Sequence, residues 1–204
     1  NDGILEKKSN NFLASIYNLK ENYGISFLDI STGEFLISEG KIEYIKNLLQ
    51  SFDPKEILIS KDFKKEFKHL FGNYNSVFYL EKWVYNEDYA IEKIKNQFKV
   101  LNLKGFGIKK DNLGIISSGS ILHYLDETQH SKLSHITNIH LIIDKDFVWM
   151  DRFTMSNLEL LKSNSNDGIS LLDVIDKTFT PMGGRMLKRW IIHPVIDLKE
   201  LEFR

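Results

Sequence analysis

The stretch from Tyr23 to Ser38, Tyr-Gly-Ile-Ser-Phe-Leu-Asp-Ile-Ser-Thr-Gly-Glu-Phe-Leu-Ile-Ser, says more about the architecture of this chain than any other. Its first half, residues 23–30, is nearly continuously apolar, as a central strand covered on both faces would be. Ser-Thr-Gly is a turn signal, and residues 34–38 return as a second strand. Upstream, residues 11–17 are compatible with another strand. The pattern therefore predicts a three-stranded meander.

Downstream of residue 40 the spacing of the apolar residues changes, and helices alternate with strands. The expected elements are a helix at residues 42–52, a strand at 56–60, a helix at 63–71 closed by Gly72, a strand at 76–80 and a helix at 90–98. Such an order makes a mixed sheet with helices on its faces, and its parallel strands should be joined by right-handed crossovers. The order matches a ribonuclease H-like topology.

A glycine-containing break at residues 105–107 separates this α/β part from a mainly helical remainder. We expect residues 1–10 to be a linker from a preceding domain, residues 11–106 to form the α/β domain, and residues 107–204 to begin a helical domain. The apolar faces of these later helices lack partners within the chain, so the second domain is predicted to be truncated.

The later helices carry start signals of their own. The elements expected after residue 107 are a helix lined by Leu113, Ile116, Ile121, Leu125 and Thr128, a short extended piece at 138–144, and helices at 151–161, 170–175 and 181–192. Ser170 stands at an N-cap, and Asp173 occupies the position that completes a capping box. Pro181 occupies a favoured first helical position.

The composition indicates a folded protein in a reducing compartment. Hydrophobic residues make up 42% and charged residues 27% of the 204 residues, which allows a packed core. The chain has no cysteine, which excludes disulfides, thiolate metal sites and cysteine nucleophiles. No run approaches the roughly 18 apolar residues of a membrane span, and the first residues lack a signal core and an initiator methionine. We therefore expect an interior piece of a larger cytoplasmic protein without membrane contact.

The formal net charge of −1 argues against independent, tight binding of duplex DNA, which needs a strong excess of Lys and Arg. A local basic face would still allow a free-standing DNA-binding module. That alternative predicts a binding constant that falls steeply with salt.

The topology invites a nuclease hypothesis, because enzymes of this fold hold two metal ions with clustered carboxylates, one of them on the first strand. Residues 11–17 carry no carboxylate. Asp29 ends the second strand just before the turn, where it is expected to bond turn amides. Glu34, Glu43 and Asp62 are the other candidates, and each lies where a solvated residue is expected. A metal-dependent nuclease remains the alternative reading.

Other chemical motifs are weak. His130, His135 and His140 follow five-residue spacing, which does not place them on one helical face, so hydrogen-bonding or surface roles are favoured over metal binding. Neither the break at residues 105–107 nor Gly183-Gly184 forms a phosphate-binding loop. We interpret Lys109-Lys110 beside the break as part of a domain hinge. The sequence predicts no catalytic, cofactor-binding or metal-binding residue in this chain.

The helix at residues 181–192 combines an apolar stripe with cations. Met182, Met186, Leu187, Trp190 and Ile191 form the stripe, and Arg185, Lys188 and Arg189 lie opposite it. A solvated cationic face explains this pattern, with positive charge favoured toward the C-terminal half of a helix. Contact of these cations with acidic protein or phosphate is the alternative.

Residues 178–194, Thr-Phe-Thr-Pro-Met-Gly-Gly-Arg-Met-Leu-Lys-Arg-Trp-Ile-Ile-His-Pro, resemble the start of the core domain of the MutS family of DNA mismatch-repair proteins. Asp197 and Arg204 stand where the family pattern has Asp and Arg. Residues 124–129, Tyr-Leu-Asp-Glu-Thr-Gln, with His135-Ile136, are similar to a second family signature.

Two further pieces extend the resemblance over the whole chain. Tyr23-Gly24 and the run from Leu28 to Phe35 resemble the connector domain of the family. Residues 151–160 resemble the family's Asp-x-x-Thr-x-Arg-Asn-Leu-Glu-Leu. Ser156 replaces the arginine of this pattern, so any ion pair made by that arginine cannot be assumed here.

The resemblance implies a non-catalytic role for this piece. MutS proteins are dimeric clamps that sense mispaired DNA with an N-terminal domain and hydrolyse ATP with magnesium in a C-terminal one, and this chain resembles neither part. Residues 11–106 would be the ribonuclease H-like connector, which links the mismatch sensor to the lever and docks MutL. Residues 107–204 would begin the core or lever domain. The resemblance thus implies a homodimer, MutL and DNA as partners of the full-length protein, with the break near residues 104–110 as a hinge.

Overall fold

The computed structural model describes residues 11–128, 133–142, 147–148, 150, 152–165 and 167–203. The chain divides into two compact units, the first spanning Asn11–Ile142 and the second containing the described residues from Phe147 onward. The linker predicted at residues 1–10 lies outside the described residues. Each unit is built from its own secondary structure.

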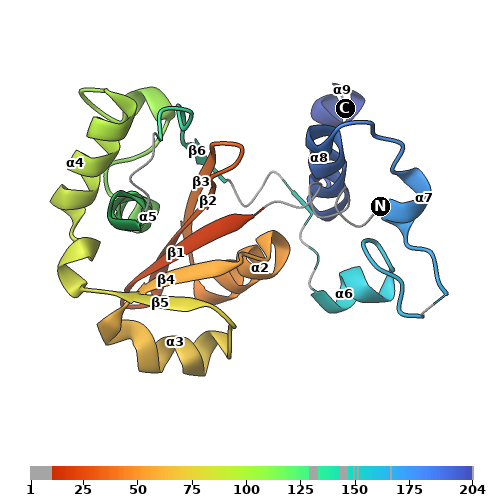
Figure 1. Ribbon diagram of the computed structural model, residues 1–204, viewed down its shortest axis with the longest axis horizontal. Coiled ribbons are helices and arrows are strands. Elements are labelled where there is room, and N and C mark those ends of the chain that lie inside the picture. Colours follow the sequence, from red (N-terminus) through yellow and green to blue (C-terminus); the bar gives the residue numbers. More distant parts are fainter. Residues whose placement is uncertain are drawn as a thin grey trace. The chain divides into compact units, whose positions relative to one another are not determined.

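A six-stranded mixed sheet forms the centre of the first unit, with strand order β5-β4-β1-β2-β3-β6 (Figure 1). The strands are β1 (Phe12–Leu19), β2 (Asn22–Asp29), β3 (Glu34–Gly40), β4 (Glu56–Ser60), β5 (Val77–Leu80) and β6 (His140–Leu141). Strands β1, β2 and β3 are antiparallel, whereas β4 pairs parallel with β1, β5 with β4 and β6 with β3. The predicted meander and mixed sheet are confirmed.

Helices cover both faces of this sheet (Figure 1). The helices of the first unit are α2 (Ile42–Phe52), α3 (Lys64–Phe71), α4 (Glu87–Phe98) and α5 (Leu113–Thr128), with short 3₁₀ turns η1 (Lys61–Phe63), η2 (Lys82–Tyr85) and η3 (Lys104–Phe106). Successive residues of a strand point to opposite faces, and β1 shows this directly. The ring of Phe12 packs edge-on against Phe52 of α2, while the hydroxyl of Ser15 bonds Ser120 of α5.

Helix α5 is the element that the sequence placed in the wrong unit. It packs on β1, β2, β3 and α4, and its residues from Gly114 to His123 are all buried. A Cβ on Gly24 of β2 would overlap the backbone carbonyl of Leu113, so glycine allows the helix to approach the sheet closely. The first unit therefore extends past the boundary expected at residue 106 and ends at Ile142.

The glycine-containing break also lies inside the first unit, which corrects its assignment as a hinge between domains. Leu103 and Ile108, on either side of η3, are buried in the same core cluster as β2, β3 and α5. The downstream boundary between the two units follows Ile142. Since Lys104–Lys110 belongs to one packed body, rotation between the units does not require these residues to move.

The second unit is helical, and α7 (Leu171–Ile175) and α8 (Pro181–Ile192) begin at capping residues. Its helices are α6 (Arg152–Asn157), α7 (Leu171–Ile175), α8 (Pro181–Ile192) and α9 (Leu198–Phe203). The capping box of Ser170 with Asp173 is present, and Pro181 follows the N-cap Thr180, whose hydroxyl oxygen accepts a hydrogen bond from Gly183 N. Helix α6 is shorter than the predicted 151–161, because Glu159 has a φ of 49° and ends the helical path.

Candidate functional site

Asp29 has the turn role that the sequence favoured. Its carboxylate is fully buried, and Oδ1 accepts hydrogen bonds from Ser31 N at 2.9 Å and from Ser31 Oγ at 2.6 Å. Its backbone carbonyl accepts the amide of Gly33 at 2.9 Å, which closes the turn between β2 and β3. The carboxylate is thus committed to backbone geometry, as expected for an Asx-type turn.

The four carboxylates of the nuclease hypothesis do not come together. Asp29 and Glu34 are paired across β2 and β3 at the end of the sheet where β1 begins. Glu43 follows β3 and Asp62 follows β4, and both lie at the opposite end of the strands. Six residues of strand separate the two ends by roughly 20 Å at about 3.4 Å per residue. No group of three or more metal-ligating side chains is assembled among the described residues, so the geometry gives the nuclease alternative no support.

The histidines also lie apart from one another. The Nε2 atom of His135 lies 2.6 Å from the carbonyl oxygen of Ile30, beside the turn that Asp29 organises. His140 is an exposed residue of β6. His130 lies outside the described residues. The hydrogen-bonding role predicted for these side chains is confirmed for His135.

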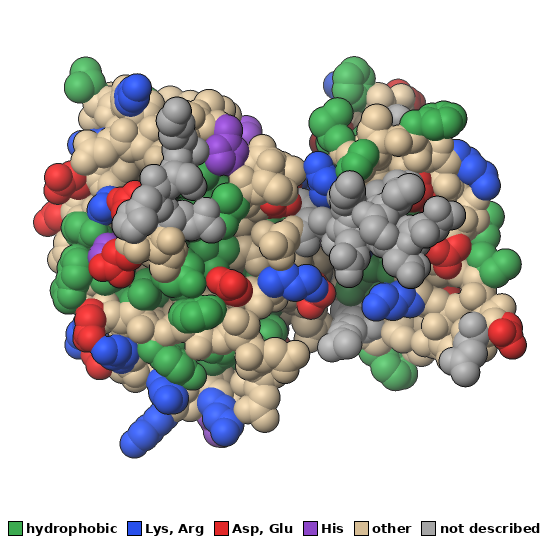
Figure 2. Space-filling model, viewed as in Figure 1, with side chains coloured by type: hydrophobic (Ala, Val, Ile, Leu, Met, Phe, Trp, Pro, Cys, Tyr) green, Lys and Arg blue, Asp and Glu red, His purple; other side chains and the backbone are tan. Residues whose placement is uncertain are grey.

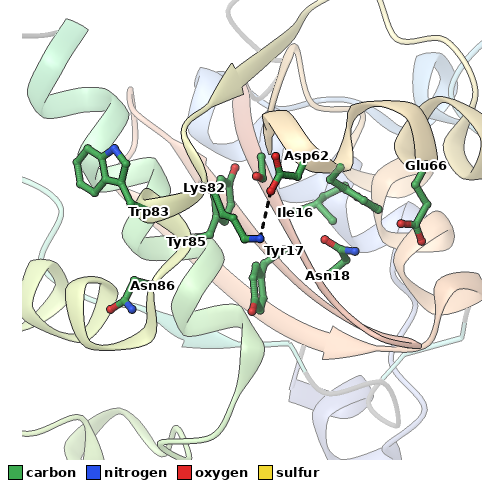
Figure 3. A pocket seen from close by; sticks show the side chains of 11 residues that line it. Ile16, Tyr17, Asn18, Asp62, Glu66, Lys82, Trp83, Tyr85 and Asn86 are labelled. Carbon is green, nitrogen blue, oxygen red and sulfur yellow. Dashed lines mark ion pairs between the residues drawn. The ribbon is translucent and has the colours of Figure 1, made fainter.

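A pocket of about 490 Å³ opens at the carboxyl ends of β1 and β4, and we call it the strand-end pocket. It is lined by Ile16, Tyr17, Asn18, Ser60, Asp62, Phe63, Glu66, Lys82, Trp83, Tyr85 and Asn86. Figure 3 shows Asp62 and Lys82 meeting in the middle of this space, and their ion pair measures 3.3 Å. Side chains of both signs and several aromatic rings thus surround this hollow.

One wall of the strand-end pocket is fixed by a polar seam between β1 and α5. Tyr17 and Tyr85 are stacked with ring centroids 6.1 Å apart. The Tyr85 hydroxyl lies 3.3 Å from Ser15 Oγ, which in turn lies 2.6 Å from Ser120 Oγ. Burial raises the pKa of the Tyr85 hydroxyl far above its ordinary value, and the hydrogen bonds of Ser15 and Ser120 only partly oppose this. Tyr85 therefore remains a neutral, positioned side chain.

A second hollow of about 500 Å³ lies between α4 and η3, and we call it the basic hollow. Its lining is mostly apolar, with Ile91, Leu103 and Ile108 among the contributors. Lys95, Lys104, Lys109 and Lys110 surround it, and Asp111 is the single carboxylate in its lining. None of these lysines forms an ion pair with a carboxylate in the part of the chain that the structure describes. The glycine-containing break at residues 105–107, which was predicted to be a domain hinge, thus borders a positively charged hollow.

The apolar stripe of helix α8 is largely exposed, as expected for a face without partners within the chain, whereas its cations differ from the predicted solvated face. The stripe residues Met182, Met186 and Trp190 are exposed, and Figure 2 shows hydrophobic side chains on the surface of this unit. The cations Arg185, Lys188 and Arg189 are each partly buried and have interaction partners, so they do not form a purely solvated face.

Ser156, which stands where the family pattern has arginine, binds a neighbouring loop. Its hydroxyl donates to Oδ1 of Asn164 at 3.1 Å, and its carbonyl accepts from Nδ2 of the same side chain at 2.9 Å. Asn164 N also donates to the Glu159 carboxylate at 2.9 Å. Short polar side chains hold this loop without an ion pair from position 156.

No helix in the described part of the chain is long and apolar enough to cross a membrane.

The first unit has the mixed sheet and flanking helices of a ribonuclease H-like connector domain, and a helical domain follows it. The family model for MutS domain II matches residues 11–137, and the model for MutS domain III matches residues 153–204. Because these matches cover most of the chain in the expected order, the chain belongs to the MutS family.

Similar proteins agree with this assignment. The DNA mismatch repair protein MutS of Flavobacterium psychrophilum is 58% identical over 96% of this chain, and that of Flavobacterium johnsoniae is 53% identical over all of it. The corresponding protein of Christiangramia forsetii is 52% identical over the whole chain. This chain spans only 22–24% of the length of these relatives.

Proposed function

We propose that this chain is the connector and the first part of the lever of a DNA mismatch-repair ATPase of the MutS family. It carries out no catalysis of its own, and it relays conformational change between mismatch sensing and ATP hydrolysis in the full-length protein. The observation that carries this proposal is the match of the chain, in order, to MutS domains II and III. Mispaired DNA, ATP with magnesium and a second subunit would be bound by the full-length protein.

The end of the first unit is suited to transmit motion. Strand β6 pairs parallel with β3, and the backbone amide of Ile142 donates to the carbonyl of Ile37 at 2.8 Å. The hydroxyl of Ser38 donates to the carbonyl of Ile142 at 3.0 Å. The chain thus leaves the sheet at Ile142, whose backbone amide and carbonyl are both hydrogen-bonded to β3. A displacement of the following segment would act on the sheet as a whole, because packed cores move as rigid bodies.

The basic hollow is the surface that we propose for docking of a MutL-like protein. An apolar centre with a charged rim is the usual anatomy of a protein interface. Four lysines against one aspartate in its lining favour an acidic partner surface, which they would also attract over a distance. Replacing Lys104, Lys109 and Lys110 together by glutamate in the full-length protein should reduce MutL recruitment on mismatched DNA at least tenfold. Unchanged recruitment would place the docking surface elsewhere.

The proposed relay of conformational change is tested by a flexible insertion between the two units. Inserting four residues, Gly-Ser-Gly-Ser, after Ile142 of the full-length protein should leave mismatch binding and basal ATP hydrolysis intact, because neither site is altered. ATP-induced release from mismatched DNA should slow about tenfold, since a flexible linker transmits little force. A matched insertion after Gly72, in an open loop of the first unit, is the control. Equal release rates for wild type and the Ile142 insertion would refute the relay.

A further inference from the structure

The strand-end pocket has no part in the relay or in the docking surface proposed above. It lies at the carboxyl ends of the adjacent parallel strands β1 and β4, which is where open α/β sheets bind their ligands. Its volume of about 490 Å³ falls within the range of small-ligand sites. The position and the size of this hollow are therefore suited to a small ligand or a single side chain.

An unsatisfied hydroxyl lines this pocket. Ser60 is only 9% exposed, and its Oγ has no hydrogen-bond partner. Ser15, on the neighbouring strand, is satisfied by Tyr85 and Ser120. Buried polar groups are nearly always paired, and one that is left alone costs free energy. The Ser60 Oγ atom is itself covered by its neighbours, so the lining places this residue beneath the pocket surface, out of reach of an occupant.

The charges in the lining favour a cationic occupant. Asp62 and Lys82 neutralise each other through their 3.3 Å ion pair, which Figure 3 shows as a dashed line. Glu66 of α3 remains, and its carboxylate has no ion pair with any described residue. The pocket therefore presents one uncompensated negative charge.

The aromatic lining favours a flat cation. Tyr17 and Tyr85 form a stacked pair, and Trp83 is 56% exposed beside the pocket. A guanidinium group is planar, stacks on aromatic faces and bonds a carboxylate through two parallel N–H groups. A lysine ammonium is a compact point charge that does neither in the same way. The amide oxygen of Asn18 offers a further acceptor in the same lining.

We propose that the strand-end pocket binds an arginine side chain presented by an extended segment of a partner protein. The Glu66 carboxylate takes the guanidinium group, and the amide oxygen of Asn18 accepts one of its remaining N–H donors. An arginine within a polypeptide fits better than free arginine, because the free amino acid would bring an α-carboxylate into a pocket whose uncompensated charge, that of Glu66, is already negative. This proposal is independent of the relay and of the docking surface at the basic hollow.

The test is calorimetric titration of this chain with an eight-residue peptide that has one central arginine among glycines and serines. The same peptide with citrulline, which keeps the shape and loses the charge, should bind at least tenfold more weakly. The lysine peptide should also bind more weakly. Binding of the citrulline peptide with equal affinity, or preference for adenosine over the arginine peptide, would overturn the proposal. So would the absence of heat at millimolar peptide.

Two variants locate the contact. Glu66→Gln should weaken binding of the arginine peptide about ten- to hundredfold, whereas Glu92→Gln, an exposed carboxylate on α4 outside the pocket, should not. Asn18→Ala should weaken binding severalfold, because the amide oxygen that accepts from the guanidinium group is lost. Ser60→Ala removes a covered hydroxyl of the same lining and is the matched control, for which the affinity should stay unchanged. Equal affinities for wild type and Glu66→Gln would show that the pocket does not recognise arginine.

Discussion

The two units of this chain are stabilised in different ways. In the first, large apolar side chains from β1, β2, β3 and β4 are completely buried between helices on both faces of the sheet. In the second, short helices begin at well-formed caps, yet many of their large apolar side chains are exposed. Local signals are thus sufficient to start a helix, while a buried core requires segments distant in the sequence to meet.

The largest expected effect contrasts one phenylalanine from each unit. Phe27 is 0% exposed and stacks on Phe52, whereas Phe179 is 102% exposed. Phe27→Ala should lower the free energy of unfolding of the first unit by about 3–5 kcal/mol, because it leaves a cavity. Phe179→Ala should change stability by less than about 0.5 kcal/mol. Urea unfolding of the whole chain measures both, and a large loss for Phe179→Ala would show that the second unit has a core of its own at that position.

A smaller effect is expected where α5 approaches the sheet. Gly24→Ala places a methyl group against the backbone of Leu113 and should cost about 1–3 kcal/mol. Gly105→Ala is the matched control, because no atom lies near its added Cβ and it should be close to neutral. Denaturant midpoints of the two variants make the comparison. Equal midpoints would mean that α5 does not pack closely on β2.

Removing an N-cap of the second unit is predicted to destabilise the helix that it begins by about 1 kcal/mol, without affecting the first unit. Ser170→Ala removes the hydrogen bond from Asp173 N, and it should increase amide exchange in α7 while β2 stays protected. Thr180→Ala should do the same in α8, where the Gly183 amide loses its acceptor. Exchange that rises equally in β2 would indicate that the two units unfold together.

The capping box should also depend on pH. The side-chain and backbone hydrogen bonds from Ser170 lower the pKa of Asp173 below its ordinary value of 3.8. A carboxylate whose pKa is depressed by folding stabilises the folded state above its unfolded pKa, and the contribution is lost as the pH falls through the folded pKa. Helicity of α7 should therefore be constant near neutrality and decline below about pH 4. Chemical shifts of Asp173 and Ser170 report this, and a change near pH 6 would contradict it.

The smallest effect is expected for the ion pair in the strand-end pocket. Asp62 and Lys82 are both largely exposed, so their ion pair is screened by water. A double-mutant cycle with Asp62→Asn and Lys82→Met should give a coupling energy below about 1 kcal/mol that shrinks with added salt. A larger, salt-independent coupling would mean that the pair acts as a structural latch across the pocket.

The local sequence was sufficient for most element boundaries and for several individual roles. Helix α2 spans Ile42–Phe52 as the apolar spacing predicted, and α3 ends at Gly72, which has a φ of 82°. The turn role of Asp29 and the capping box of Ser170 also followed from nearest neighbours in the chain. Each of these features is set by interactions over a few residues, which a sequence pattern records directly.

Features that depend on distant partners could be known only once the chain was folded. Four apolar positions and Thr128 predicted a one-sided α5, yet the serines and glycines of this helix are buried as well, because the sheet and α4 cover it on several sides. The strand-end pocket joins Asn18 of β1, Glu66 of α3 and Trp83 of η2, and no spacing pattern links these residues.

Sequence periodicity thus established which residues form helices, strands, turns and caps, and shared motifs pointed to the MutS family. Only the tertiary structure shows that α5 belongs to the first unit, that the candidate carboxylates lie at opposite ends of the sheet, and which side chains line a pocket. The reason is that hydrogen bonds within a turn or cap act over a few residues, whereas burial and charge pairing depend on where distant segments pack.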